Sequence, residues 1–237
     1  LQVSRKGPAE FVYNADRKAE KMVREDLAKA RPGYGFLMEE TGEVEGSDKT
    51  HRWIIDPLDG TTNFLHGLPH FAISIALERE GEIVAGVVYE PIRDELFWAE
   101  KGVGAFVNHQ RLRVSARRNL ADALIATGIP FKGHGDMGTF LAQLQAMMGQ
   151  VAGIRRWGAA SLDLAYVAAG RFDGFWERDL KPWDLAAGSL LVTEAGGFVS
   201  EINGHKNYLD GSSILAANPF LHGPLHTILH NAVKPKA

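Results

Sequence analysis

Short strand-like segments follow one another between residues 71 and 114 of this 237-residue chain. Segments 71–78 and 83–89 are rich in β-branched and aromatic residues and meet at a turn around Gly81. Shorter segments of the same kind follow at 95–99, 104–107 and 111–114. Strands this close together predict antiparallel hairpins, because parallel neighbours need long crossover connections.

Helical patterns dominate the second half of the chain. We expect helices at 139–150, 160–169 and 184–195, the last ended by Gly196-Gly197. Strands at 172–176 and 214–216 and a final helix reaching Ile228 complete this half. Near the beginning, the pattern predicts a helix over 16–30, a short strand over 35–38 and a polar surface loop over 42–49.

The change of pattern near residues 115–125 predicts an α+β protein built from two parts. Residues 1–118 would form an N-terminal part with an antiparallel sheet, and residues 119–237 a C-terminal α/β part. The two parts are expected to form one compact catalytic unit.

Composition excludes several classes of protein. The content of 45% apolar and 23% charged residues is ordinary for a soluble protein. A net charge of −3 without a basic block does not favour direct nucleic-acid binding, and no apolar run has the roughly 18–20 residues of a membrane helix. The lack of cysteine excludes disulfides, thiolate ligands and a cysteine nucleophile. We therefore expect a cytoplasmic protein that does not bind membranes.

Two carboxylates lie three residues apart in the stretch Asp56-Pro57-Leu58-Asp59-Gly60-Thr61-Thr62. The apolar triplet 53–55 before it predicts the end of a buried strand, which Pro57 should stop because it cannot donate to a β-ladder. Gly60 allows a tight bend, after which a helix can begin with its free N–H groups facing an anion. Carboxylates beside an anion site make sense mainly with divalent cations between them. The alternative interpretation is an ordinary structural turn.

Other acidic residues lie at chain reversals where they could complete such a site. Glu39 and Glu40 end a strand, and because adjacent strand residues point to opposite faces, only one should enter the site. Asp184 is well placed as a helix N-cap, which is its structural alternative. Glu177 closes a strand and by itself is better explained as a solvent-facing charge. Hard oxygen ligands of this kind favour Mg²⁺ or Mn²⁺ over zinc.

Four motifs resemble those of the inositol monophosphatase family. The stretch WIIDPLDGTTNF at 53–64, and WDLAAG at 183–188 with EAGG at 194–197, are similar to the paired signatures of the family. Glu39-Glu40-Thr41 and Trp157-Gly158-Ala159-Ala160-Ser161 resemble two shorter motifs in the expected order. The resemblance covers nearly the whole chain and implies a layered α/β/α/β/α sandwich, a homodimer and inhibition by lithium.

The same resemblance implies roles for individual residues. The expected ligands of two or three Mg²⁺ ions, or of Mn²⁺, are four carboxylates and one backbone carbonyl: Glu39, Asp56, Asp59, Asp184 and Leu58. Backbone N–H groups of Gly60 and Thr61 would hold the phosphate. Glu177 and Ala160 would contact the hydroxylated ring of the substrate. A basic residue, Arg5 or Lys6, would belong to a flap over the site.

The absence of a Ser–His or Cys arrangement predicts that water attacks the phosphate monoester directly. Glu39 and the Thr61 hydroxyl are the candidates to orient and deprotonate that water, and Asp59 would help to hold the metal that neutralises the leaving alkoxide. The expected reaction is Mg²⁺-dependent hydrolysis of inositol monophosphate. Relatives hydrolyse histidinol phosphate, fructose 1,6-bisphosphate and 3′-phosphoadenosine nucleotides, so these substrates stay open.

A function of another class also stays open. Some bacterial members of this family act as binding proteins in RNA-polymerase antitermination complexes, so RNA polymerase is a second candidate partner beside a small phosphorylated polyol. A binding protein has no need to keep repelling carboxylates together, so the complete ligand set argues against a purely non-catalytic role.

Overall fold

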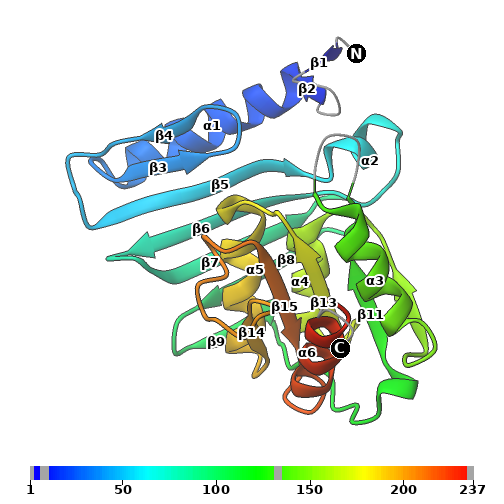
Figure 1. The fold of residues 1–237 in the computed structure, drawn as a ribbon. Coiled ribbons are helices and arrows are strands. Elements are labelled where there is room, and N and C mark those ends of the chain that lie inside the picture. Colours follow the sequence, from blue (N-terminus) through cyan, green and yellow to red (C-terminus); the bar gives the residue numbers. More distant parts are fainter. Residues whose placement is uncertain (1–2, 6–10, 131–134, 234–237) are drawn as a thin grey trace.

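The computed structural model describes residues 3–5, 11–130 and 135–233 (Figure 1). It contains a two-stranded hairpin, β1 (Val3–Arg5) with β2 (Phe11–Tyr13), and two larger sheets. None of the helices in the described part combines the length and apolar character that a membrane crossing needs.

The larger sheet has eight strands in the order β10-β9-β8-β7-β6-β5-β3-β4. They are β3 Gly35–Met38, β4 Gly42–Val44, β5 His51–Asp59, β6 Ala72–Arg79, β7 Glu82–Glu90, β8 Glu95–Glu100, β9 Gly104–Val107 and β10 Gln110–Arg111. All neighbours run antiparallel except β3 and β5. The predicted hairpins after residue 70 are therefore confirmed.

Two details of this sheet differ from the predictions. Gly42–Val44 forms the edge strand β4 against β3, where the polar composition predicted a loop. Charged residues are common on edge strands because one side of the strand faces water. The strand predicted at 111–114 is wrong, since β10 ends at Arg111.

The smaller sheet has five strands in the order β12-β11-β13-β15-β14. They are β11 Leu124–Thr127, β12 Gly153–Arg155, β13 Gly174–Arg178, β14 Phe198–Ser200 and β15 Ser213–Ala217. β11 runs parallel to β12 and β13, whereas β15 runs antiparallel to β13 and β14. A short 3₁₀ helix, Leu120–Asp122, precedes the sheet.

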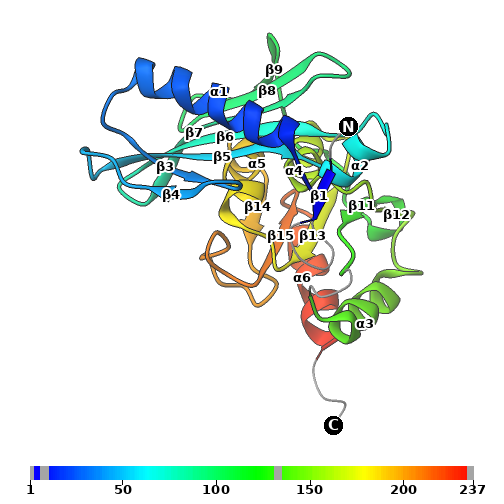
Figure 2. The ribbon, with the colours of Figure 1, turned by 90° about the horizontal axis from the view of Figure 1, so that it is seen from above.

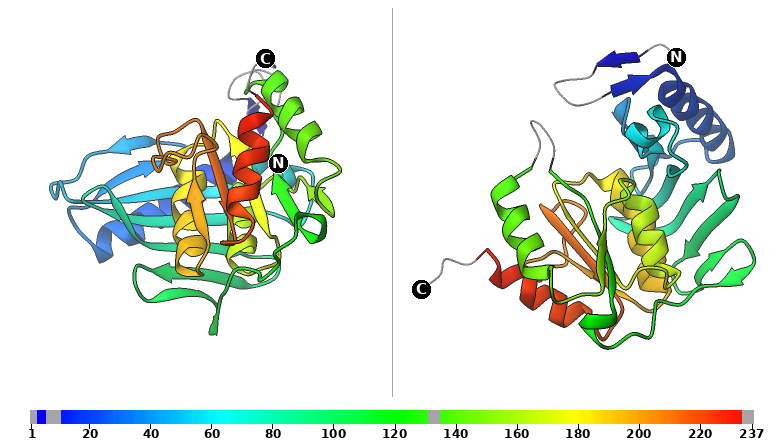
Figure 3. Two further views of the ribbon diagram at one scale, coloured as in Figure 1. Left: turned by 60° about the horizontal axis from the view of Figure 1, so that its bottom comes forward. Right: turned by 90° about the vertical axis from the view of Figure 1, so that its right-hand side faces the viewer.

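Helices occupy three layers around the sheets. They are α1 Asn14–Ala30, α2 Thr61–Leu65, α3 Met137–Met147, α4 Ala160–Ala168, α5 Pro182–Glu194 and α6 His222–Asn231. α1 lies across the outer face of the large sheet, where its Val23 and Leu27 pack against Phe36, Met38 and Ile55 (Figure 2). α4 and α5 fill the space between the sheets, and α3 and α6 cover the outer face of the small sheet (Figures 1 and 3). The predicted α+β fold, an α/β/α/β/α sandwich, is confirmed.

Small residues allow the central layer to pack closely. A Cβ atom on Gly86 of β7 would lie 2.9 Å from the Cα of Ala187 in α5. On Gly188, it would lie 2.6 Å from the Cβ of Leu164 in α4. Side chains from both sheets and from α4 and α5 form one buried cluster, so the two halves of the chain share a core.

Candidate active site

The acidic turn lies where β5 leaves the large sheet. β5 continues through Pro57 to Asp59, and its pairing with β6 shifts register between Asp56 and Asp59. The prediction that Pro57 ends the strand is therefore wrong. Pro57 can lie within the strand because the pairing is irregular there. A proline at a bulge need not donate a hydrogen bond to the partner strand.

Local hydrogen bonds hold the two aspartates of this turn in place. The Leu58 N–H donates to Oδ1 of Asp56 at 2.9 Å, and the Thr61 hydroxyl donates to the Leu58 carbonyl at 2.9 Å. Asp56 is 2% exposed and Asp59 9% exposed. Two carboxylates this deeply buried need partners that compensate their charge.

Asp59 finds its partners at the beginning of α4. Oδ2 of Asp59 accepts hydrogen bonds from the Ser161 backbone N–H at 2.7 Å and from the Ser161 hydroxyl at 2.5 Å. The N–H groups of Ala160 and Leu162 also act on this carboxylate. Unpaired N–H groups at a helix N-terminus attract negative charge. The carboxylate of Asp59 therefore caps α4 from another part of the chain.

Only one member of the Glu39-Glu40 pair faces Asp56. The Glu39 side chain is hydrogen-bonded to Asp56. Glu40 lies toward α1, where its backbone N–H donates to Glu20 at 2.8 Å and its carboxylate forms an ion pair with Arg17 at 3.6 Å. Both residues lie in the turn after β3, and their side chains nevertheless point to different sides, as the strand pattern predicted.

Asp184 approaches the same region from the start of α5. The N-cap of α5 is Lys181, since Pro182 suits the first position of a helix. Asp184 is thus the third residue of the helix. The prediction that it occupies the N-cap position is wrong, because Lys181 occupies it. Its Oδ2 accepts from the Lys181 N–H at 2.7 Å, so the carboxylate still satisfies the helix end. Ser74 of β6 fixes this segment by donating to the Trp183 carbonyl at 3.2 Å.

The acidic residues act on one another electrostatically. Burial raises the pKa of Asp56 well above its usual value, and the charges of Glu39, Asp59 and Asp184 raise it further. Burial also raises the pKa of Asp184, with Asp59, Glu39 and Glu177 adding to the effect. Burial raises the pKa of Asp59 against the opposing hydrogen bonds from Ser161. The predicted ligands therefore lie close enough for their charges to act on the carboxyls of Asp56 and Asp184.

Gly60 gives the turn its shape. Its φ of 89° lies in the left-handed region, and it is the N-cap of α2. A Cβ here would lie 3.0 Å from the His70 carbonyl oxygen and 3.3 Å from the Ala159 side chain. Backbone conformation and space thus both favour glycine. The expectation that Gly-Thr-Thr begins a helix is confirmed.

A pocket of about 610 Å³ opens beside these acids. Three predicted site residues line it: Glu39, Glu177 and Asp184. Apolar and aromatic side chains supply much of the remaining wall, among them Ile129, Pro130, Phe140, Leu180 and Trp183. Ala160 lies outside this lining, at the beginning of α4. The pocket is large enough for a small organic phosphate.

Glu177 is held in the pocket by close packing against Gly128, where any Cβ would overlap its carboxylate. Burial raises the pKa of Glu177 to about 8; the nearby Arg156 opposes the rise and Asp59 adds to it. A carboxyl with this pKa is largely protonated at neutral pH, and it can then donate one hydrogen bond as well as accept. The solvent-facing alternative for Glu177 is therefore not supported.

The donor chemistry of the site fits divalent cations. Asp56, Asp59 and Asp184 form no ion pair with any lysine or arginine in the part of the chain that the structure describes. Among the described residues, their carboxylates are compensated by hydrogen bonds from backbone N–H groups and from Ser161. Within the described ranges, no group of three or more His, Asp or Glu side chains meets the distances of a metal cage. The fit therefore rests on charge and donor type, which are those of Mg²⁺ and Mn²⁺ sites.

Three residues near the site received no role from the sequence. Ser161 orients Asp59, although a serine in the first turn of a helix gives no hint of a distant partner. Asn63 of α2 donates from Nδ2 to the carbonyls of His70 and Trp157, both at 2.8 Å. Asp163 is 1% exposed in α4, and its Oδ1 lacks a hydrogen-bond partner among the described residues. For Asp163, the available signal was a charged residue inside the apolar helix α4.

The predicted flap falls at the edge of what the structure describes. Arg5 ends β1 and pairs with Phe11 in the hairpin. Lys6 lies outside the described residues.

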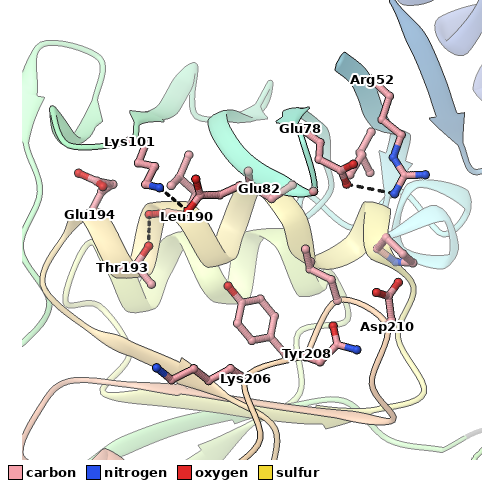
Figure 4. A pocket seen from close by; sticks show the side chains of 16 residues that line it. Arg52, Glu78, Glu82, Lys101, Leu190, Thr193, Glu194, Lys206, Tyr208 and Asp210 are labelled. Atoms are coloured by element: carbon pink, nitrogen blue, oxygen red, sulfur yellow. Dashed lines mark hydrogen bonds and ion pairs between the residues drawn. The ribbon is translucent and has the colours of Figure 1, made fainter. Parts of the chain in front are cut away.

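A second cavity, of about 510 Å³, lies between the large sheet, α5 and the segment 206–210 (Figure 4). Several charged side chains on its wall have partners in the protein. Arg52 contacts Glu78 at 3.0 Å, Lys101 contacts Glu82, and Glu194 accepts from the Gly102 N–H at 2.8 Å. The predicted site residues do not line this cavity. The acidic pocket is therefore the candidate active site.

Three known proteins are similar to this chain over most of its length. An inositol-1-monophosphatase from Rhizobium meliloti is 59% identical over 236 residues, 100% of this chain and 89% of that protein. A protein of Escherichia coli named Nus factor SuhB is 48% identical over 219 residues, 92% of this chain and 82% of that protein. The crystal structure of the extragenic suppressor protein suhB from Bartonella henselae matches with a TM-score of 0.94 at 58% identity, covering 97% of this chain and 89% of that one.

The model of one protein family accounts for almost the entire sequence. The inositol monophosphatase family matches residues 1–234, which include the acidic turn, both helix starts and the pocket. Because this match, the high identities and the layered fold agree, the chain belongs to the inositol monophosphatase family.

Proposed function

We propose that this protein is a Mg²⁺-dependent phosphomonoesterase that hydrolyses inositol monophosphate to inositol and phosphate. The observation that carries the proposal is the group of mutually repelling carboxylates, Asp56, Asp59 and Asp184, beside a pocket of about 610 Å³. Buried like charges destabilise a fold unless a ligand uses them. Membership of a phosphatase family supports the same chemistry.

The divalent cations would be held by the carboxylates of Glu39, Asp56, Asp59 and Asp184 and the carbonyl of Leu58. When bound, they would supply Lewis-acid stabilisation of the negative charge that develops on the phosphoryl group and on the leaving oxygen. Oδ1 of Asp59 is suited to this role because the hydrogen bonds from Ser161 occupy the other oxygen. The Leu58 carbonyl retains a second lone pair beside the bond from Thr61.

Glu39 and Thr61 would position the attacking water. The Thr61 hydroxyl donates its proton to the Leu58 carbonyl, so its oxygen is left to accept a hydrogen bond from water. The Glu39 carboxylate would accept the proton that the water loses. The N–H groups of Gly60 and Thr61, at the beginning of α2, would hold phosphate oxygens.

Glu177 would bind the organic part of the substrate. It lines the pocket with Glu39 and Asp184, so a polyol attached to the phosphate would reach its carboxyl. A hydroxyl-rich ring offers both donors and acceptors to a carboxyl of this kind. Ala160, at the beginning of α4, would also contact the ring.

A phosphate-release assay tests the proposal. Purified protein with Mg²⁺ would be offered inositol 1-phosphate, histidinol phosphate, fructose 1,6-bisphosphate and 3′-phosphoadenosine nucleotides, with EDTA as the control. We expect Mg²⁺-dependent release that is fastest with inositol 1-phosphate. Faster release from another substrate would reassign the specificity, and no release from any of them would contradict a phosphatase function.

A second function deserves a direct test because of one observation. The relative from E. coli that is 48% identical carries the name Nus factor SuhB. A role as a binding partner of RNA polymerase in antitermination could coexist with hydrolysis. Pull-down of RNA polymerase with the wild type and with Asp59→Asn separates polymerase binding from hydrolysis. If the variant loses turnover but still binds the polymerase, the interaction is an independent role.

We further propose a cytoplasmic homodimer inhibited by lithium, in line with the family resemblance. Equilibrium sedimentation measures the oligomeric state. Inhibition of phosphate release by lithium at fixed Mg²⁺ measures the sensitivity.

A further inference from the structure

Three histidines lie on one face of α6, far from the candidate active site in the sequence. His222, His226 and His230 follow each other at intervals of four residues. In an α-helix, side chains four residues apart lie one above the other. Two histidines at this spacing are the pair that binds zinc in helical metal sites.

The rings of His226 and His230 are neighbours. Their centroids are 5.5 Å apart, and the ring planes differ by only 11°. Both side chains are half-buried.

One nitrogen of this pair lacks a partner. Nε2 of His226 is buried and has no hydrogen bond in the part of the chain that the structure describes. Gly204 covers it, and a Cβ at that position would lie 3.3 Å from the nitrogen. The glycine therefore leaves room beside a polar atom whose burial without a partner is unfavourable.

His222 is occupied in another way. Its Nε2 lies 3.1 Å from the Ser200 hydroxyl, and its ring packs edge-on to Phe198 at 6.0 Å. As noted above, no group of three His, Asp or Glu in the described ranges is arranged to hold a metal. The two remaining histidines are therefore the available ligands, and water would complete the coordination.

We propose that His226 and His230 form a two-histidine binding site for a divalent transition-metal ion such as Zn²⁺ or Ni²⁺. Imidazole nitrogens suit these ions, whereas Mg²⁺ prefers oxygen. The site is thus chemically distinct from the carboxylate cluster and does not depend on the proposed phosphatase function.

Calorimetric titration with ZnCl₂ tests the proposal. The tag-free chain carries Asp56→Asn and Asp184→Asn, so that the carboxylate cluster does not compete, and the buffer contains excess Mg²⁺. We expect one equivalent of Zn²⁺ to bind. Mutation of residues that only hydrogen-bond to metal ligands lowers metal affinity about 10- to 100-fold. Loss of a ligand itself in His226→Gln or His230→Gln should therefore lower the affinity for Zn²⁺ at least about tenfold.

His222→Gln is the matched control, since it lies on the same helix face but its nitrogen bonds to Ser200. We expect it to bind Zn²⁺ as the parent does. Circular dichroism and melting without zinc verify that each variant is folded. Unchanged affinity in both His226→Gln and His230→Gln, or an equal loss in His222→Gln, would overturn the assignment.

Discussion

Ser161 donates two hydrogen bonds to a single carboxylate oxygen of Asp59, one from its backbone at 2.7 Å and one from its hydroxyl at 2.5 Å. The two residues are 102 positions apart, in different halves of the chain. The first turn of α4 thereby fixes a carboxylate that emerges from the large sheet. Both printed hydrogen bonds from Ser161 go to Oδ2, so they do not occupy Oδ1.

Ser161→Ala removes the hydroxyl donor and leaves the backbone bond. A hydrogen bond to a charged group contributes about 1.5–3 kcal/mol, and about 1.4 kcal/mol corresponds to a tenfold change in rate. We therefore expect kcat for inositol 1-phosphate to fall about tenfold or more at saturating Mg²⁺. Asp59→Asn, which removes a proposed metal ligand, should lower kcat by several orders of magnitude while the fold is retained.

Ser213→Ala is the control for loss of a buried hydroxyl elsewhere, because Ser213 accepts from the Ile202 N–H at 3.1 Å in the small sheet. It should leave kcat unchanged. Equal turnover in Ser161→Ala and Ser213→Ala would show that Ser161 does not position Asp59 for catalysis. Near wild-type turnover in Asp59→Asn would remove Asp59 from the metal ligands.

Local patterns predicted much of this fold, and contacts between distant segments account for what they missed. The hairpins after residue 70 and the helix after Gly60 depend on alternation and turn residues close by. The bond between Ser161 and Asp59 depends on tertiary packing, which a local pattern does not contain. β5 passes Pro57 because its partner strand shifts register there, and this too is set by a neighbour.

Glu177→Gln should raise KM for polyol phosphates and leave small aryl phosphates unaffected. The amide keeps the size of the side chain but changes which hydrogen bonds it can exchange with a hydroxylated ring. Loss of one such bond to a buried group is worth about 1–3 kcal/mol, so we expect KM to rise roughly tenfold. Steady-state kinetics with inositol 1-phosphate and p-nitrophenyl phosphate provide the comparison. An equal effect on both substrates would show that Glu177 is not a substrate contact.

Gly128→Ala should displace the same carboxyl without changing its chemistry. Gly128 follows β11, and a Cβ there would overlap the Glu177 carboxylate. We expect a rise in KM for inositol 1-phosphate of about the same size as in Glu177→Gln, and little further effect in the double variant, because both changes act on one group. Gly223→Ala is the control, since a Cβ there meets nothing within 4 Å. Additive effects in the double variant would contradict this coupling.

Removal of metal should destabilise the fold through the repulsion among Asp56, Asp59 and Asp184. A ligand that binds only the folded state raises Tm by mass action, so Mg²⁺ should raise Tm relative to EDTA. Asp184→Asn removes one of the repelling charges and keeps an oxygen for the Lys181 N–H. We expect a higher Tm than wild type in EDTA and a smaller rise with Mg²⁺. A lower Tm in EDTA would indicate that the charge of Asp184 stabilises the fold.

His70 should make stability depend on pH. It is 9% exposed and packs against the rings of Trp157 and Tyr166, and its two ring nitrogens have no hydrogen-bond partner in the described part of the chain. Burial, aided by the charge of Arg93, lowers the pKa of His70 from 6.5 to about 4. The unfolded chain therefore binds a proton between these values that the folded protein does not, and stability is lost as the pH falls from 6.5 to about 4.

His70→Phe keeps an aromatic ring between Trp157 and Tyr166 and removes the titrating group. The unfolding free energy, measured by urea titration, should then fall less steeply than in wild type as the pH decreases from 6.5 to 4. The difference in slope corresponds to the one proton that the His70 side chain binds on unfolding in the wild type. Stability at pH 7 should be retained, because the lost nitrogens have no partners to leave unsatisfied. The exposed His66 supplies the control, and His66→Gln should follow the wild-type curve. If His70→Phe follows it as well, the buried imidazole does not set the acid sensitivity of this fold.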